Sequence, residues 1–377
     1  MILALIMMIG LIVAFIAVFT TISPPERGLW VAVGDDYTGG YGNIMYSADG
    51  KKWEETKSGA SFSGTGSNGS GVAYGKDKWV AVGYDRATGG YANIISSTDG
   101  KVWEETKSGA SFSTRGYSVA YGKDKWVAVG DDGGGYGSIM YSTDGKVWVD
   151  SSEGGASFSG SVSSGLGVAY SSKQDLWVAV GKNSAPGYYG NIMWSNDGMC
   201  WVISGMGSNQ GEDFGIYGND VAYSSKQNRW VAVGADNNDG GYGSIMYSAD
   251  GKIWLDSSDG DSFSGSGSNG IGIAYSSKQD LWVAVGNDGT EGGYGSIMWS
   301  NDGMCWVKTN EGASFSGSFP FETVGCLQEI SERHQYHIEK HYQENAVNIL
   351  HTRYDTKDKY HQTRSYSIFN PSESVFS

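Results

Sequence analysis

The chain has 377 residues and a net charge of -15, with 59 glycines, 24 tyrosines and 14 tryptophans but only 5 prolines. This composition describes many tight turns and large packing side chains, which excludes a disordered polypeptide. The acidic balance argues against sequence-independent binding to nucleic acid or to an anionic membrane surface, because both need a basic surface.

Residues 1–22 contain no charged side chain. As a helix they would extend about 33 Å, which is enough to cross a bilayer. A cleaved signal peptide usually has a basic start and a shorter apolar run, so we expect an uncleaved transmembrane signal-anchor, with a cleaved signal peptide as the alternative. The first reading predicts a single-pass membrane protein with its bulk outside the cytosol, and the second a secreted protein.

One sequence unit recurs six times between residues 28 and 317. The string WVAVG is followed each time by I-[MI]-x-S-x-D-G-x-x-W, and its copies lie 47 to 53 residues apart, beginning at Trp30, Trp79, Trp126, Trp177, Trp230 and Trp282. This period is typical of propeller blades and lacks the 3.6-residue apolar pattern of helical repeats. Within one unit, residues 165–203 show four strand-like runs separated by Ser, Gly, Asn and Asp clusters. We therefore predict an all-β fold, a six-bladed β-propeller of four-stranded antiparallel blades over residues 28–325.

Each unit contains the turn S-x-D-G-x-x-W. An Asp-Gly pair between apolar runs predicts a hairpin, because glycine accepts a positive φ and the carboxylate can accept backbone N–H bonds within its own turn. We expect the tryptophan that follows to pack between blades. The carboxylates assigned this structural role are those of Asp49, Asp99, Asp144, Asp197, Asp250 and Asp302.

The framework WVAVG followed by IxYSxDGxxW resembles the Asp-box of BNR-type propellers, which include sialidases, and the propeller repeats of bacterial and phage surface proteins. The resemblance implies a propeller in which the Asp turns lie away from the functional face. The usual pattern has one more residue between Asp and Gly. Sialidases bind the substrate carboxylate with three arginines, whereas the repeats here contain only Arg27, Arg86, Arg115 and Arg229. Arg27 and Arg229 lie in loops at one face of the ring, and Arg86 and Arg115 lie in loops at the other. At most two arginines therefore share a face, so an arginine triad like that of sialidases is not expected.

The loops after WVAVG are acidic and rich in glycine, carry a tyrosine, and vary in length while the strands around them barely change. Variable loops on a rigid scaffold are where binding usually resides. We expect no cofactor other than Ca²⁺, which the carboxylates could hold, and the tyrosines could stack on sugars or peptides. The candidate ligand-binding residues are Asp35, Asp36, Tyr41, Asp131, Asp132, Tyr136, Asp236, Asp239, Tyr242, Asp288 and Tyr294. The alternative is that Gly-Gly-Tyr only forms a hairpin with an aromatic lid.

Two segments could supply the innermost strand of the first blade and so close the ring. Residues 19–23 precede the first WVAVG, and Phe321 to Gly325 (FETVG) follow the last repeat at the spacing of the other inner strands; we favour the second. Beyond it, residues 326–377 form a non-repetitive polar tail that holds all five histidines. His334, His337 and His341 would share one face of a helix, as metal ligands can, and the other reading is a tail without a site.

The repeats offer little sign of catalysis. Residues 1–333 contain no histidine, so no Ser-His-Asp or Cys-His arrangement can be assembled there, and we assign no catalytic residue. We predict a monomeric, membrane-anchored or secreted binding or adhesion module for a glycan or protein ligand, and expect no enzyme activity. Two alternatives stay open: a glycoside hydrolase-like enzyme with paired carboxylates, and a purely structural surface protein.

Overall fold

The computed structural model describes residues 29–309 and the backbone of Tyr366–Phe369. Short stretches within the first range lie outside the described part, namely residues 35–42, 57, 63–65, 86–92, 107, 110, 132–137, 152–155, 161, 185–189, 205–212, 236–243, 258–260, 264–266 and 288–294. The elements assigned in the described part are all β-strands. Nothing there is a helix long and apolar enough to cross a membrane, and the predicted anchor at residues 1–22 lies outside it.

The strands form six sheets, which we call blades 1 to 6 in chain order and list from the inner strand outward. Blade 1 contains β25 (Tyr366–Phe369), β1 (Trp30–Gly34), β2 (Ile44–Ser47) and β3 (Glu54–Glu55), and blade 2 contains β4 (Asn68–Gly75), β5 (Lys78–Tyr84), β6 (Ile94–Ser97) and β7 (Glu104–Glu105). Blade 3 contains β9 (Gly116–Gly122), β10 (Lys125–Gly130), β11 (Ile139–Ser142) and β12 (Val147–Asp150), with β8 (Ser108–Gly109) added in parallel at its outer edge. Blade 4 contains β13 (Ser164–Ser171), β14 (Leu176–Lys182), β15 (Ile192–Ser195) and β16 (Val202–Ile203). Blade 5 contains β17 (Tyr217–Ser224), β18 (Arg229–Ala235), β19 (Ile245–Ser248) and β20 (Leu255–Asp256), and blade 6 contains β21 (Asn269–Ser276), β22 (Leu281–Asn287), β23 (Gly295–Ser300) and β24 (Val307–Lys308).

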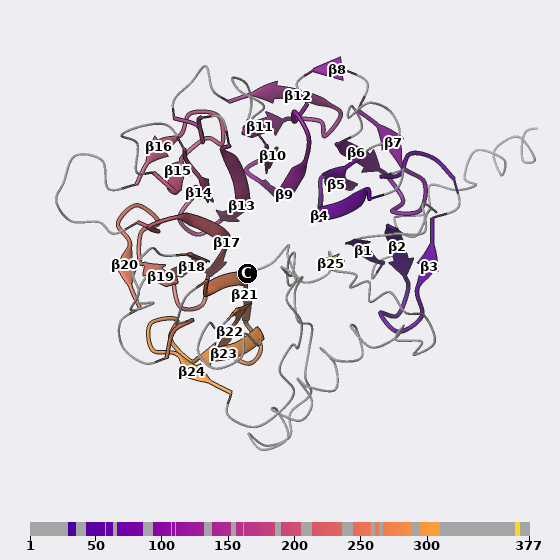
Figure 1. The fold of residues 1–377 in the computed structure, drawn as a ribbon. Coiled ribbons are helices and arrows are strands. Elements are labelled where there is room, and N and C mark those ends of the chain that lie inside the picture. The colour runs from indigo at the N-terminus through magenta and orange to yellow at the C-terminus, as the bar shows by residue number, and fades with distance from the viewer. Residues whose placement is uncertain are drawn as a thin grey trace, which may run out of the picture.

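The blades are arranged around a common centre, with β4, β9, β13, β17 and β21 innermost and the two-residue strands outermost (Figure 1). Within each blade, the four strands that follow one another from the inner edge outward are antiparallel, and only the added β8 is parallel to its neighbour. WVAVG pairs with the I-[MI]-x-S strand in one register throughout, for example Trp30 with Ser47 and Trp230 with Ser248. The predicted all-β propeller of four-stranded antiparallel blades is confirmed at this level.

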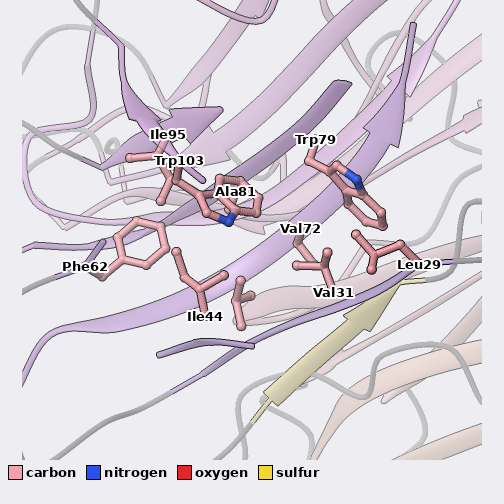
Figure 2. Close-up of a cluster of buried hydrophobic side chains, with 10 residues drawn as sticks. Leu29, Val31, Ile44, Phe62, Val72, Trp79, Ala81, Ile95 and Trp103 are labelled. Atoms are coloured by element: carbon pink, nitrogen blue, oxygen red, sulfur yellow. The ribbon is translucent and has the colours of Figure 1, made fainter. Parts of the chain in front are cut away.

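The core lies between the blades. Between blades 1 and 2, Val31 and Ile44 from one sheet meet Trp79, Ile95 and Trp103 from the next (Figure 2). Four further clusters repeat this arrangement between successive blades up to blade 6. Both faces of a WVAVG strand are therefore buried, which explains why the string reads as a continuous apolar run instead of an alternating one.

Phenylalanines in the segments that join one blade to the next complete these cores, and we call these segments the clasps. Phe62, Phe112, Phe158, Phe214 and Phe263 are each at most 2 % exposed. Each packs against the glycine that ends WVAVG in the following blade; a Cβ placed on that glycine would lie 2.5 to 3.1 Å from the ring, at Gly83, Gly130, Gly181, Gly234 and Gly286. Only glycine leaves room for the clasp ring.

The strand beside β1 is not the one that the sequence indicated. β25 pairs antiparallel with β1, with Val31 opposite Phe369 and Gly34 opposite Tyr366. We expected residues 321–325 in this place, with residues 19–23 as the alternative, and both segments lie outside the described residues. The paired strand therefore comes from the segment predicted to be a tail. Its sequence, Tyr-Ser-Ile-Phe, combines aromatic and β-branched residues that favour strands.

Candidate functional site

One end of the ring carries the connections that follow the WVAVG strands, and we call it the loop face. Of the candidate ligand-binding residues, only Asp131 lies within the described part. The other candidates lie outside the described residues, and they are Asp35, Asp36, Tyr41, Asp132, Tyr136, Asp236, Asp239, Tyr242, Asp288 and Tyr294. Their role in binding stays a prediction, and the site below is built from the described residues at the base of those loops.

Asp131 joins blade 3 to blade 4 at the loop face. Its Oδ1 accepts a hydrogen bond from Ser164 Oγ at 2.7 Å, and its Oδ2 accepts one from Thr114 Oγ1. Its backbone N–H donates to Arg115 O at 2.8 Å. Both carboxylate oxygens thus accept hydrogen bonds from hydroxyls of the protein. The side chain links the segment before β9, through Thr114, to the start of β13, through Ser164.

The clasps anchor the far end of each loop. Asn93 Nδ2 donates to Phe112 O at 2.7 Å and Asn191 Nδ2 donates to Phe214 O at 2.6 Å; Asn43 makes the same bond to Phe62. Blade 5 uses Ser244 instead, whose Oγ accepts a hydrogen bond from Phe263 N at 3.1 Å. The loops after WVAVG and the joining segments therefore meet at one end of the ring, and in blades 1, 2, 4 and 5 the clasp fixes the base of the loop.

A cation lies among aromatic rings on the loop side of blades 2 and 3. The Arg115 guanidinium lies 5.4 Å from the ring centre of Tyr84 and 5.6 Å from that of Tyr117. Stacking on aromatic faces holds a guanidinium in place. The other described arginine, Arg229, lies at the opposite end of the ring, where its Nη1 donates to Asp302 O. The two described arginines do not converge, and Arg27 and Arg86 lie outside the described residues.

Sequence reasoning missed a polar junction between the inner strands of blades 5 and 6. Asp220 Oδ2 accepts a hydrogen bond from Ile273 N at 3.0 Å, and its Oδ1 accepts one from Val221 N at 2.8 Å. Beside it, Asn219 Nδ2 donates to Gly270 O at 2.6 Å and Asn269 Nδ2 donates to Tyr217 Oη at 3.1 Å. Burial raises the pKa of Asp220 to about 7 against the opposing effect of its two backbone hydrogen bonds.

The signal that could have found Asp220 is an alignment of the repeats against one another. The residue before the central valine or isoleucine of the inner strand is Gly71, Ser118, Gly167 and Gly272 in the other blades. A second partly buried carboxylate, Asp213, likewise replaces the serine that precedes the clasp phenylalanine elsewhere. It accepts hydrogen bonds from Asn191 N and Phe214 N, both at 2.9 Å, and burial raises its pKa to about 6. Blade 5 thus departs most from the repeat.

The opposite end of the ring is uniform, and we call it the Asp-turn face. In every blade the turn aspartate accepts two backbone N–H bonds through Oδ1, for example from Lys252 and Ile253 to Asp250, both at 2.9 Å. The preceding serine, Ser248, donates to the same Oδ1 at 3.1 Å. These contacts occupy the carboxylates in holding the hairpins. The tryptophans after the turns are at most 2 % exposed in blades 2 to 6.

Inner-strand tyrosines add a second repeated feature near the Asp-turn face. Tyr170 lies against Trp177 with ring centres 4.7 Å apart, and Tyr74, Tyr121, Tyr223 and Tyr275 make the same contact in their blades. Each hydroxyl donates to a carboxylate or amide of its own hairpin, as Tyr275 does to Asp280 at 2.5 Å. Burial, followed by this hydrogen bond, raises the pKa of Tyr275 to about 12. These tyrosine hydroxyls stabilise their hairpins as hydrogen-bond donors and are not suited to act as general bases.

The described residues provide no cluster of three or more His, Cys, Asp or Glu side chains that could hold a metal ion. The Ca²⁺ prediction concerned the loop carboxylates, nearly all of which lie outside those residues. Cys200 and Cys305 are exposed and unpaired in the described part.

No protein-family model matches the chain, and no curated protein matches it. Solved structures with a similar fold include a putative 6-phosphogluconolactonase from Bacteroides uniformis, with 12% sequence identity and a TM-score of 0.48 over 74% of this chain and 81% of that one. A periplasmic gluconolactonase of Pseudomonas aeruginosa has 8% identity and a TM-score of 0.45, covering 74% and 82% of the two chains. The extracellular domain of a putative one component system from B. thetaiotaomicron has 8% identity and a TM-score of 0.43, covering 70% of this chain and 31% of that one. At these identities the similarity concerns the fold alone.

Proposed function

We propose that the protein is a binding or adhesion module that uses the loop face to hold a carbohydrate or protein ligand outside the cytosol. The observation that carries this proposal is the contrast between the two ends of the ring. The Asp-turn face repeats the same aspartate contacts from blade to blade. The loop face changes its polar residues from blade to blade, and Tyr84, Arg115 and Asp131 are examples. Residues that vary on a constant scaffold are suited to recognition.

The chemistry of the loop face favours a neutral polar ligand such as a glycan, or a ligand with cationic groups. The chain carries a net charge of -15, so a strongly anionic ligand would be repelled. Tyrosine rings such as those of Tyr84 and Tyr117 present an apolar face and a polar tip, which suits contacts with sugars. The loop carboxylates would supply oxygen ligands if Ca²⁺ takes part. The same proposal includes a monomer that residues 1–22 anchor to a membrane or direct to secretion.

An enzyme with paired carboxylates is the alternative, and the raised pKa values of Asp213 and Asp220 are the observation that favours it. A general acid in a glycosidase needs such a raised pKa. Here each carboxylate accepts two backbone N–H bonds that fix neighbouring segments. Those contacts give both residues a structural use, so binding without catalysis is the better proposal.

Binding to a glycan array, with the full chain and with or without added Ca²⁺, tests the proposal. We expect a restricted set of glycans to bind, and a dependence on Ca²⁺ if the loop carboxylates hold the ion. Hydrolysis of a bound glycan would support the enzyme instead. If the array and a panel of candidate surface proteins both give no binding, the structural alternative is favoured.

A further inference from the structure

Blade 1 differs from the other blades in the exposure of the face that its neighbour should cover. Trp30 and Trp53 are partly exposed, whereas the ten tryptophans at the same two positions in blades 2 to 6 are at most 2 % exposed. Met45 is also partly exposed, while its counterparts Ile95 and Met140 are fully buried. We call Trp30, Met45 and Trp53, with the buried Gly34 beside them, the blade 1 surface. It has the composition of one half of an interblade core.

In blades 2 to 6 the corresponding surface is covered by strands of the preceding blade together with its clasp. The clasp backbone adds to the outer strand: Ala60 N donates to Trp103 O at 2.7 Å, Ala156 N donates to Trp201 O at 2.9 Å, and Asp261 N donates to Trp306 O at 2.9 Å. The clasp phenylalanine then packs on the glycine that ends WVAVG. A blade thus offers a tryptophan carbonyl and a glycine to its clasp, and in blade 1 these are Trp53 O and Gly34.

The chain contains a sixth clasp sequence that has no blade after it. Residues 312–318 read GASFSGS, like residues 59–64 (GASFSG) before blade 2 and residues 155–161 (GASFSGS) before blade 4. Phe315 follows Trp306 by nine residues, the same spacing that separates Phe62 from Trp53 and Phe263 from Trp254. This segment begins just after β24, at the outer edge of blade 6, and lies outside the described residues.

We propose that residues 312–318 dock on the blade 1 surface of the same chain, with Phe315 on Gly34 and the backbone of Ala313 bonded to Trp53 O. The opposite side of the same junction is slightly less buried than its counterparts. Val283 and Val285 of blade 6 are each 7% exposed, whereas their counterparts Val178 and Val180 are fully buried. Docking of the sixth clasp places the apolar ring of Phe315 between the facing surfaces of blades 6 and 1, and joins the last blade to the first. It does not depend on the ligand of the loop face.

Hydrogen exchange of the full wild-type chain, read by mass spectrometry, tests the docking without any substitution. The described clasp around Phe263 serves as the internal standard, because Asp261 N is bonded to Trp306 O. We expect the peptide covering residues 312–316 to be protected to a similar degree as that covering 260–264. Exchange at the rate of an unstructured peptide overturns the proposal. Protection that appears only at concentrations where the chain associates, as judged by light scattering, overturns it too, since the clasp would then occupy a second copy.

The Phe315→Ala variant adds a second readout, with Phe263→Ala as the matched control at a described clasp. Each should lower the midpoint of thermal unfolding by about 5 to 15 °C, because each removes a buried aromatic ring. Phe315→Ala should also speed exchange around Trp53 and leave exchange around Trp254 unchanged. A Phe315→Ala variant with the wild-type midpoint and wild-type exchange at Trp53 contradicts the docking.

Discussion

Asp220 is an ionisable residue placed where the other inner strands carry glycine or serine. Its folded pKa is raised to about 7 from 3.8. Between these two values the native state binds a proton that the unfolded state has released, so the free energy of unfolding falls as the pH rises through this range. The contribution is fully present below the unfolded pKa and is lost above the folded one.

Asp220→Asn should flatten this pH dependence. Asparagine keeps an acceptor oxygen for one of the two inner-strand N–H groups and carries no charge at any pH. We expect wild type to lose on the order of 1 to 4 kcal/mol between about pH 4.5 and about pH 8 from this residue, toward the lower end because the side chain keeps some exposed area. Urea unfolding at both pH values measures the difference, with Glu105→Gln on an exposed outer strand as the control. A variant that retains the wild-type slope would show that the carboxylate titrates normally.

Gln227 links blade 5 to blade 6 through a single amide. Its Oε1 accepts a hydrogen bond from the buried Trp282 Nε1 at 2.7 Å, and its Nε2 donates to Asp280 Oδ1 and to Asn301 O, both at 2.8 Å. Gln227→Ala should cost about 1 to 3 kcal/mol, because the buried indole N–H is left without an acceptor. Lys226→Ala is the matched control, since it removes only an exposed ion pair with Asp280 and should cost less than about 1 kcal/mol. Equal losses in chemical unfolding would contradict this account.

At the scale of the element, the Asp turn is the most uniform piece of the chain. Burial acts to raise the pKa of Asp250, but hydrogen bonds from Ile253 N and Lys252 N outweigh it, and the pKa is lowered. The stability from this carboxylate is therefore present above its unfolded pKa and is lost as the pH falls through the folded one.

Asp250→Ala leaves the two turn N–H groups without their acceptor. We expect a loss of about 1 to 3 kcal/mol at neutral pH, and a smaller difference from wild type in acid, where the wild-type carboxylate is protonated as well. Thermal unfolding at both pH values measures it, with Glu55→Ala on the exposed strand β3 as the control. A difference from wild type that grows in acid would disprove the role of the ionised carboxylate.

The repeat could be predicted because its signals are local. A few neighbouring residues are enough to predict the Asp-Gly turns and the WVAVG strands, and the period of the copies indicates the propeller. The partner of β1 could not be found in this way. Tyr366–Phe369 pairs with a strand more than 300 residues away and shares no motif with the inner strands, so only tertiary pairing identifies it. Asp220 was missed for a related reason, since it is informative only against the glycines and serine of the other blades.

For the whole molecule, the two kinds of carboxylate predict a stability maximum in mild acid. The six turn aspartates have lowered pKa values and lose their contribution below about pH 4, while Asp213 and Asp220 lose theirs as the pH rises toward neutrality. Partial protonation also relieves the self-repulsion of a chain with a net charge of -15. Calorimetry across pH should place the highest unfolding midpoint near about pH 4 to 5. A midpoint that rises steadily up to about pH 8 would be inconsistent with these shifts.

The central claim is that the loop face binds the ligand, whereas the Asp-turn face stabilises the hairpins of the propeller. The most direct measurement is glycan binding by two variants with equal unfolding midpoints. One replaces residues 35–42, 132–137, 236–243 and 288–294 with Gly-Ser sequences of equal length, and the other changes two exposed lysines beside the Asp turns, Lys51 and Lys146, to serine. We predict that the first variant loses the glycans that wild type binds and that the second keeps them. Retained binding in the first variant, or loss only in the second, would contradict the claim.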